Sequence, residues 1–176
     1  MICAKQHGSI GSLKMIKRNR KGRADFNENG KSYCGPLTLT VITGRRYDIV
    51  EKHILKMREL NTRGFIEPWG NRVVRMKDSE LRSMFRYYGY KMVAFVDEDG
   101  TTMDNEFWSN STVRNWTKKT YGVRYKKWFV ISTRNHYLVV SGNKVWDTYS
   151  PSEGISVVHM PHKKAKIRAV WEVTNG

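Results

Sequence analysis

The spacing of hydrophobic residues changes halfway along the chain, and this change is the strongest constraint on the fold. In the first half, apolar residues recur at helical spacing, as Leu81, Met84, Phe85 and Tyr88 do at positions i, i+3, i+4 and i+7. After Gly122, short runs rich in β-branched and aromatic residues follow one another with short turns. Helices followed by consecutive strands are typical of an α+β domain, so we predict N-terminal helices packed on a C-terminal antiparallel β-sheet.

The predicted elements have recognisable ends. The predicted helices span residues 35–43, 47–60, 79–88 and 111–120, and the predicted strands span 90–96, 128–133, 137–140, 144–149, 155–160 and 166–173. In the first helix, Pro36 stands in the opening turn and Gly44 just past the end. Its β-branched residues have poor helix propensity, so burial must sustain it. Asp78 or Ser79 is the predicted N-cap of the third helix, and Ser111 that of the fourth.

Length and composition fit one domain with a basic extension. The chain has 176 residues, of which 39% are hydrophobic. Residues 1–24 contain seven Lys or Arg and no acid, which predicts a basic, partly flexible N-terminal arm. Residues 25–176 then form a single domain. No apolar run reaches the roughly 18 residues of a membrane span, and the N-terminus does not resemble a secretory signal, so we expect a cytoplasmic protein.

The charge of the chain indicates a polyanionic partner. Lys and Arg number 32 against 16 Asp and Glu, which gives a formal charge of +16. Such an excess favours nonspecific contact with nucleic acid, and with anionic membrane surfaces second. The candidate anion-binding residues lie in two clusters: Lys17, Arg18, Arg20, Lys21, Arg23, Lys163 and Lys164.

The stretch around Cys34 raises the question of chemistry. Cys3 and Cys34 are the only cysteines, which is not a disulfide framework. Cys34 directly precedes Gly35-Pro36 at the start of a predicted helix, where free N–H groups and the helix dipole favour a thiolate. Its backbone N–H would also face an oxyanion that forms beside the sulfur. The other interpretation is that Cys34 is a small buried hydrophobe.

A later hairpin supplies candidate partners for this thiol. A turn at Gly142-Asn143 pairs Val140 with Val145, and this register places five residues on one face: His136, Leu138, Val140, Val145 and Asp147. An Asp beside a His can fix the tautomer of the imidazole and stabilise imidazolium. Two polar groups on an aliphatic face must satisfy each other or a third group, which makes them candidate catalytic partners of Cys34. The alternative is that His136 is structural and that Asp147 is a turn acceptor.

These segments resemble one known superfamily. The stretches CGPLTLTVITG and NHYLVVSGNKVWDTYSP look like those of papain-like cysteine peptidases, closest to small bacterial domains that process double-glycine leader peptides and to related phage and prophage proteins. The resemblance covers roughly residues 26–151 and implies a papain-like fold. It implies that Cys34 is the nucleophile, His136 the general base and Asp147 the residue that orients it. It also implies a peptide or isopeptide substrate and, for a phage-encoded chain, the cytoplasm of the host.

One position departs from the pattern of that family. Where a Gln usually completes the oxyanion hole, this chain has Glu28, whose carboxylate would repel an oxyanion. Asn27 and Asn29 are the candidates to replace it. This departure and the net charge keep a second hypothesis open, a non-enzymatic nucleic-acid-binding or host-interaction protein on the same scaffold.

The remaining histidines suggest no metal site. We expect His53, His159 and His162 to lack ligand-like neighbours, with HMPH as coil, and we predict no metal and no cofactor.

Overall fold

A computed structural model gives the structure of the protein. It describes residues 33–62, 73, 75–95, 111–122, 124–125, 127–148, 150, 153–160 and 162–176, and structural statements below refer to these residues. The predicted N-terminal arm and most of the expected loop at 61–77 lie outside them.

The predicted α+β organisation is confirmed. Three helices, α2 (Cys34–Thr43), α3 (Tyr47–Thr62) and α4 (Asp78–Tyr87), precede most of the strands, and the short helix α6 (Val113–Lys119) follows the first strand. The strands are β1 (Tyr90–Ala94), β2 (Trp128–Thr133), β3 (Tyr137–Ser141), β4 (Lys144–Trp146), β5 (Ile155–Ser156) and β6 (Ile167–Asn175). They form one antiparallel sheet in the order β1-β6-β2-β3-β4-β5.

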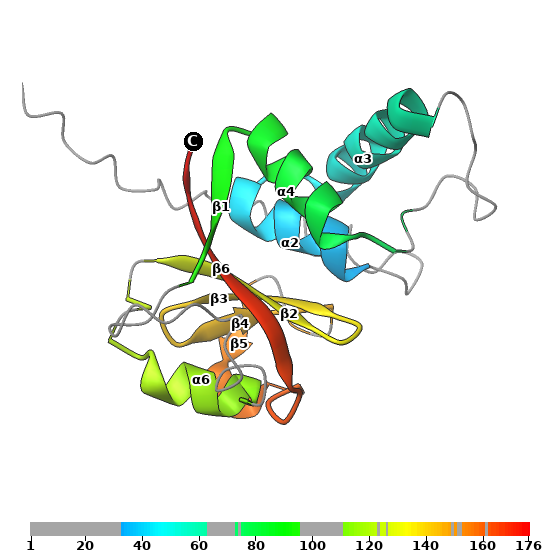
Figure 1. Ribbon diagram of the computed structural model, residues 1–176. Coiled ribbons are helices and arrows are strands. Elements are labelled where there is room, and N and C mark those ends of the chain that lie inside the picture. The colour runs from blue at the N-terminus through cyan, green and yellow to red at the C-terminus, as the bar shows by residue number, and fades with distance from the viewer. Residues whose placement is uncertain are drawn as a thin grey trace, which may run out of the picture.

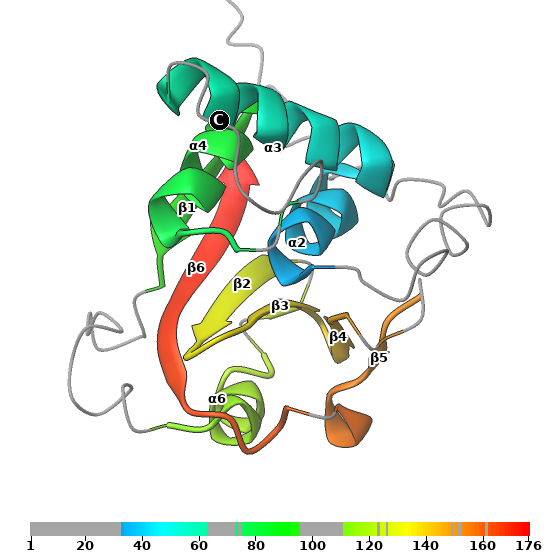
Figure 2. The same ribbon diagram turned by 90° about the vertical axis from the view of Figure 1, so that its right-hand side faces the viewer.

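The sheet has a hydrophobic layer on each face. Figures 1 and 2 show α2, α3 and α4 on one side of the sheet and α6 on the other. The first cluster joins Leu39 of α2 and Phe85 of α4 to sheet residues such as Val139. The second joins Trp116 of α6 to residues such as Leu138. Because neighbouring residues of β3 face opposite sides, both kinds of position are apolar.

Helix α2 forms because it is buried almost all round. Its residues from Gly35 to Thr40 are buried, and so is Ile42, which confirms that packing compensates for poor propensity. Gly44 ends the helix in the left-handed conformation, with φ of 67°, and its N–H bonds to the Thr40 carbonyl. None of the described helices is both long and apolar enough to cross a membrane.

Two predicted caps are wrong by one residue. Lys77, in extended conformation, is the N-cap of α4, and Asp78 is the first helical residue. The side chain of Asp78 instead accepts a hydrogen bond from the Tyr137 hydroxyl. At α6 the N-cap is Thr112 rather than Ser111, and its hydroxyl accepts from the Asn115 N–H at 3.3 Å.

The last strands are shorter than predicted. β4 ends at Trp146 rather than residue 149, and β5 covers only Ile155–Ser156 before the 3₁₀ helix η1 (Val157–His159). The Ser156 hydroxyl accepts from the Val158 N–H at 3.4 Å, so this side chain starts the turn where the sequence pattern predicts a strand.

The hairpin of β3 and β4 has the predicted register. Val140 pairs with Val145, and both lie with Leu138 in the cluster on one face. However, that face packs against α6. A catalytic pairing of Cys34 with His136 predicts that this face lies beneath the helix that begins at Cys34. That prediction is wrong, because α2 covers the opposite face, which carries Tyr137 and Val139.

We predict that Gly35 is required for the position of α2. A Cβ built on Gly35 would stand 2.8 Å from both Cβ and Sδ of Met76, whereas one on Gly122 meets nothing within 4 Å. Gly35→Ala should therefore lower the free energy of unfolding by about 1–3 kcal/mol through overpacking. Gly122→Ala should change it by less than about 0.5 kcal/mol. Denaturant unfolding measures both, and equal stabilities of the two variants would contradict this account.

Candidate active site

Cys34 lies at the start of α2 against the beginning of β3. It is a free, partly buried thiol, and the backbone N–H groups of Tyr137, Gly35 and Cys34 itself lower the pKa of its sulfur. The Tyr137 nitrogen is covalently bonded to the carbonyl carbon of His136. The sulfur therefore lies beside the backbone of the predicted general base.

The end of β4 makes this contact available. Val139 pairs with Trp146, and β4 stops there, before the position that would face Tyr137. On the other side, β3 continues its bonding to β2, where the Thr133 N–H donates to the His136 carbonyl at 2.9 Å. Alternate N–H groups of a strand point to opposite neighbours, so the Tyr137 N–H points to where β4 has ended. The effect of the Tyr137 N–H on the pKa of Cys34 indicates that the thiol lies on this side of β3.

Burial decides the ionisation of this thiol. Desolvation raises the pKa of Cys34, and the three backbone N–H groups lower it by less. The backbone N–H groups at the helix start do lower the pKa of Cys34, as expected. Burial raises that pKa by more, so the expectation that the thiolate is favoured is wrong. At neutral pH the resting group is the thiol.

His136 and Asp147 come together as the hairpin register predicts. One side-chain ligand atom each of His136, Asp147 and His162 lies within 4.8 Å of the others. Asp147 is buried, with 1% of its surface exposed. A turn holds it after β4, because its N–H donates to the Ser150 hydroxyl at 2.8 Å and that hydroxyl donates to the Asp147 carbonyl at 2.9 Å.

The surroundings keep His136 neutral. The pKa of His136 is lowered to about 4, first by burial and then by the charge of His162, while Asp147 acts in the opposite direction. An imidazole with this pKa is unprotonated at pH 7 and can accept a proton.

His162 is the functional candidate that the sequence analysis missed. The centroid of its ring lies 4.7 Å from the centroid of the His136 ring, and the two ring planes form an angle of 47°. The prediction that His162 lacks ligand-like neighbours is wrong, because the loop before β6 brings it to the start of β3. His159 lies outside this cluster of described residues and is exposed at the end of η1.

Tyr137 is a second residue that the pattern did not single out. Its hydroxyl donates to the Asp78 carboxylate and to the Met76 carbonyl, the latter at 3.1 Å. Burial and then Asp78 raise the pKa of Tyr137, and the charge of Cys34 acts in the same direction. This side chain therefore ties the first turn of α4 to the strand beside the thiol.

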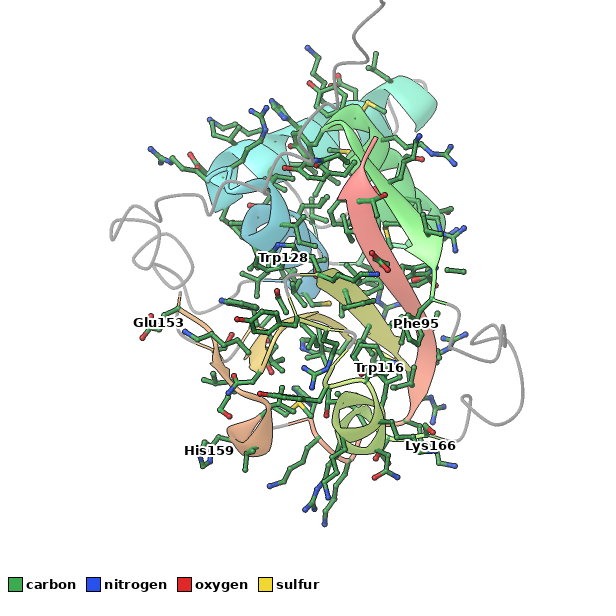
Figure 3. All side chains as sticks on the ribbon, turned by 90° about the vertical axis from the view of Figure 1, so that its left-hand side faces the viewer. Phe95, Trp116, Trp128, Glu153, His159 and Lys166 are labelled. Atoms are coloured by element: carbon green, nitrogen blue, oxygen red, sulfur yellow. The ribbon has the colours of Figure 1, made fainter. Side chains whose placement is uncertain are left out.

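A basic surface lies on the α6 side of the molecule. The Arg114 N–H donates to the Lys163 carbonyl at 2.9 Å, which places α6 beside the loop before β6. Figure 3 shows nitrogen-tipped side chains extending from α6 into solvent, with Lys166 nearby. We define the basic surface as Arg114, Lys118, Lys119, Lys163, Lys164 and Lys166. Segments 111–119 and 162–168 contain no Asp or Glu.

Several predicted site residues cannot be placed. The oxyanion-hole candidates Asn27 and Asn29, together with Glu28, lie outside the described residues. So do Cys3 and the basic residues Lys17, Arg18, Arg20, Lys21 and Arg23. Of the predicted anion-binding residues, Lys164 is exposed and Lys163 half-buried.

Comparisons with protein-family models, curated proteins and solved structures found no match to this chain.

Proposed function

We propose that this protein is a papain-like cysteine hydrolase that cleaves a peptide or isopeptide bond, with Cys34 as nucleophile, His136 as general base and Asp147 as the residue that orients it. The resemblance of the two motifs to papain-like peptidases suggested these roles. We place the reaction in the cytoplasm, as the sequence analysis expects, and in that of the host for a phage-encoded chain.

The observation that carries this proposal is the effect of the Tyr137 backbone N–H on the Cys34 sulfur, whose pKa it lowers. It joins the start of α2 to the residue that follows His136, over a separation of about a hundred positions in the sequence. Asp147 independently lies within 4.8 Å of a His136 ring nitrogen through its carboxylate. Three segments distant in sequence thus meet at one end of β3.

The chemistry begins from a neutral pair. Because both Cys34 and His136 are uncharged at rest, His136 accepts the thiol proton as the sulfur attacks the carbonyl carbon, and Asp147 stabilises the imidazolium that forms. The Cys34 N–H faces the resulting oxyanion. His136 then protonates the leaving amine, and water hydrolyses the thioester, with His136 again accepting a proton.

We predict that one thiol carries the activity. Exposure to electrophilic peptide probes, followed by intact-mass measurement, should show a single adduct that persists in Cys3→Ala and disappears in Cys34→Ala. Hydrolysis of any peptide substrate found in this way should disappear with Cys34→Ala. Asp147→Asn should lower kcat by about 10²–10⁴-fold, because the imidazolium loses its stabilising charge. Substantial turnover by Cys34→Ala would refute the mechanism.

The neutral thiol also predicts the pH dependence of alkylation. The folded Cys34 pKa is raised, so the thiolate fraction is small at pH 7 and increases only above the ordinary thiol pKa of about 8.5. In the Cys3→Ala variant, the iodoacetamide reaction rate should therefore still be rising above pH 9. Urea-unfolded protein, in which burial is lost, provides the control and should show a lower apparent pKa. A folded-state midpoint below about 8.5 would contradict the burial effect.

The basic surface supports a second candidate function, nonspecific binding of nucleic acid. Its six basic residues come from α6 and the adjacent loop, in segments without a carboxylate. Cations clustered in this way bind phosphates with release of counterions. This function does not require Cys34.

We predict salt-dependent binding of duplex DNA at this surface. The affinity should fall with salt at a log–log slope of about −0.9 for each phosphate neutralised. Replacing Lys118, Lys119 and Lys164 by Gln should flatten that slope. The matched control replaces Lys52, Lys56 and Lys91 by Gln. These lysines are exposed on α3 and β1, and their replacement removes the same charge. Equal slopes for the two triple variants, measured by fluorescence anisotropy, would exclude a dedicated surface.

A further inference from the structure

We propose that His136, Asp147 and His162 bind a divalent transition-metal ion, with Zn²⁺ as the ion that fits best. The site goes beyond the hydrolase proposal, since it uses a residue that the hydrolase does not and does not require the thiol.

The geometry is close to that of a three-ligand site. The three ligand atoms lie within 4.8 Å of one another. In a tetrahedral site with Zn–N distances of about 2.0–2.1 Å, neighbouring ligand atoms stand about 3.3 Å apart. Small rotations of the side chains would therefore complete the coordination. Nε2 of His136 is buried and has no hydrogen-bond partner in the part of the chain that the structure describes. A buried ring nitrogen without a partner is costly, and a metal ion would satisfy it.

The ligand types select the ion. Two imidazoles and one carboxylate suit Zn²⁺ and Fe²⁺, whereas Mg²⁺ and Ca²⁺ prefer sites made of oxygen atoms. The buried carboxylate of Asp147 supplies negative charge to the site in a chain whose formal net charge is +16. Three protein ligands also leave a coordination position for water or another molecule, as in catalytic rather than structural zinc sites.

Each ligand stands on an independently anchored segment. His136 is fixed by the bond from the Thr133 N–H to its carbonyl at 2.9 Å. Asp147 is held in the turn that Ser150 closes. The carbonyl of His162 accepts a hydrogen bond from the Ala165 N–H at 2.9 Å. The carbonyl of the next residue, Lys163, accepts one from the Arg114 N–H of α6, also at 2.9 Å. A site assembled before the ion arrives needs little reorganisation to bind it.

The two uses of His136 exclude each other where the hydrolase proposal also holds. A lone pair that coordinates a metal cannot accept the proton of the thiol. If the hydrolase proposal is correct, the metal would therefore inhibit it, and the site would regulate the same imidazole.

The test measures binding of Zn²⁺ alone by competition with a chromophoric chelator, and of Co²⁺ by its visible absorption spectrum. The full-length protein should bind one ion per chain at the site and unfold at a higher temperature with Zn²⁺. His162→Asn and Asp147→Asn should each weaken binding by at least about tenfold. His159→Asn changes an exposed histidine three positions from His162 and should leave binding unchanged.

Cys34→Ala separates this proposal from the hydrolase. It should bind Zn²⁺ as tightly as the unaltered chain, whether or not the protein proves to be an enzyme. Zn²⁺ affinity unchanged in His162→Asn, with circular dichroism showing a folded variant, would overturn the site. So would loss of binding in Cys34→Ala, because the thiol would then hold the ion.

Discussion

Removal from water at the start of β3 determines the resting ionisation of Cys34 and His136. The sheet is covered on both faces, by α2, α3 and α4 on one and by α6 on the other, and each face carries a hydrophobic cluster. Desolvation disfavours any charged form there. It raises the pKa of Cys34 and lowers that of His136, and both groups rest neutral.

The same environment permits two uses of one imidazole. A neutral, buried histidine is a proton acceptor for a thiol, and it is also the form that coordinates a metal ion. Tyr137 brings the thiol to the backbone next to His136, and the loop before β6 brings His162 to its ring.

Most contacts that build the candidate site form where regular secondary structure ends. β4 stops at Trp146, which frees the Tyr137 N–H to meet the sulfur and lets the chain turn at Asp147. Gly35 allows α2 to approach Met76, and the Tyr137 hydroxyl bonds to the Asp78 carboxylate at the start of α4. The functional residues thus occupy positions where one element ends against another.

Local periodicity in the sequence determined the helices, most of the strands and the register that puts Asp147 beside His136. Such patterns are properties of adjacent residues, which is why the pairing of Val140 with Val145 could be predicted. The ends of β4 and β5 could not, because side chains such as those of Ser150 and Ser156 compete locally with strand pairing. Only the tertiary structure decided that β6 lies between β1 and β2, that α2 covers the Tyr137 face, and that His162 joins the site. It also decided the ionisation of Cys34, because desolvation depends on packing between residues that are far apart in the chain.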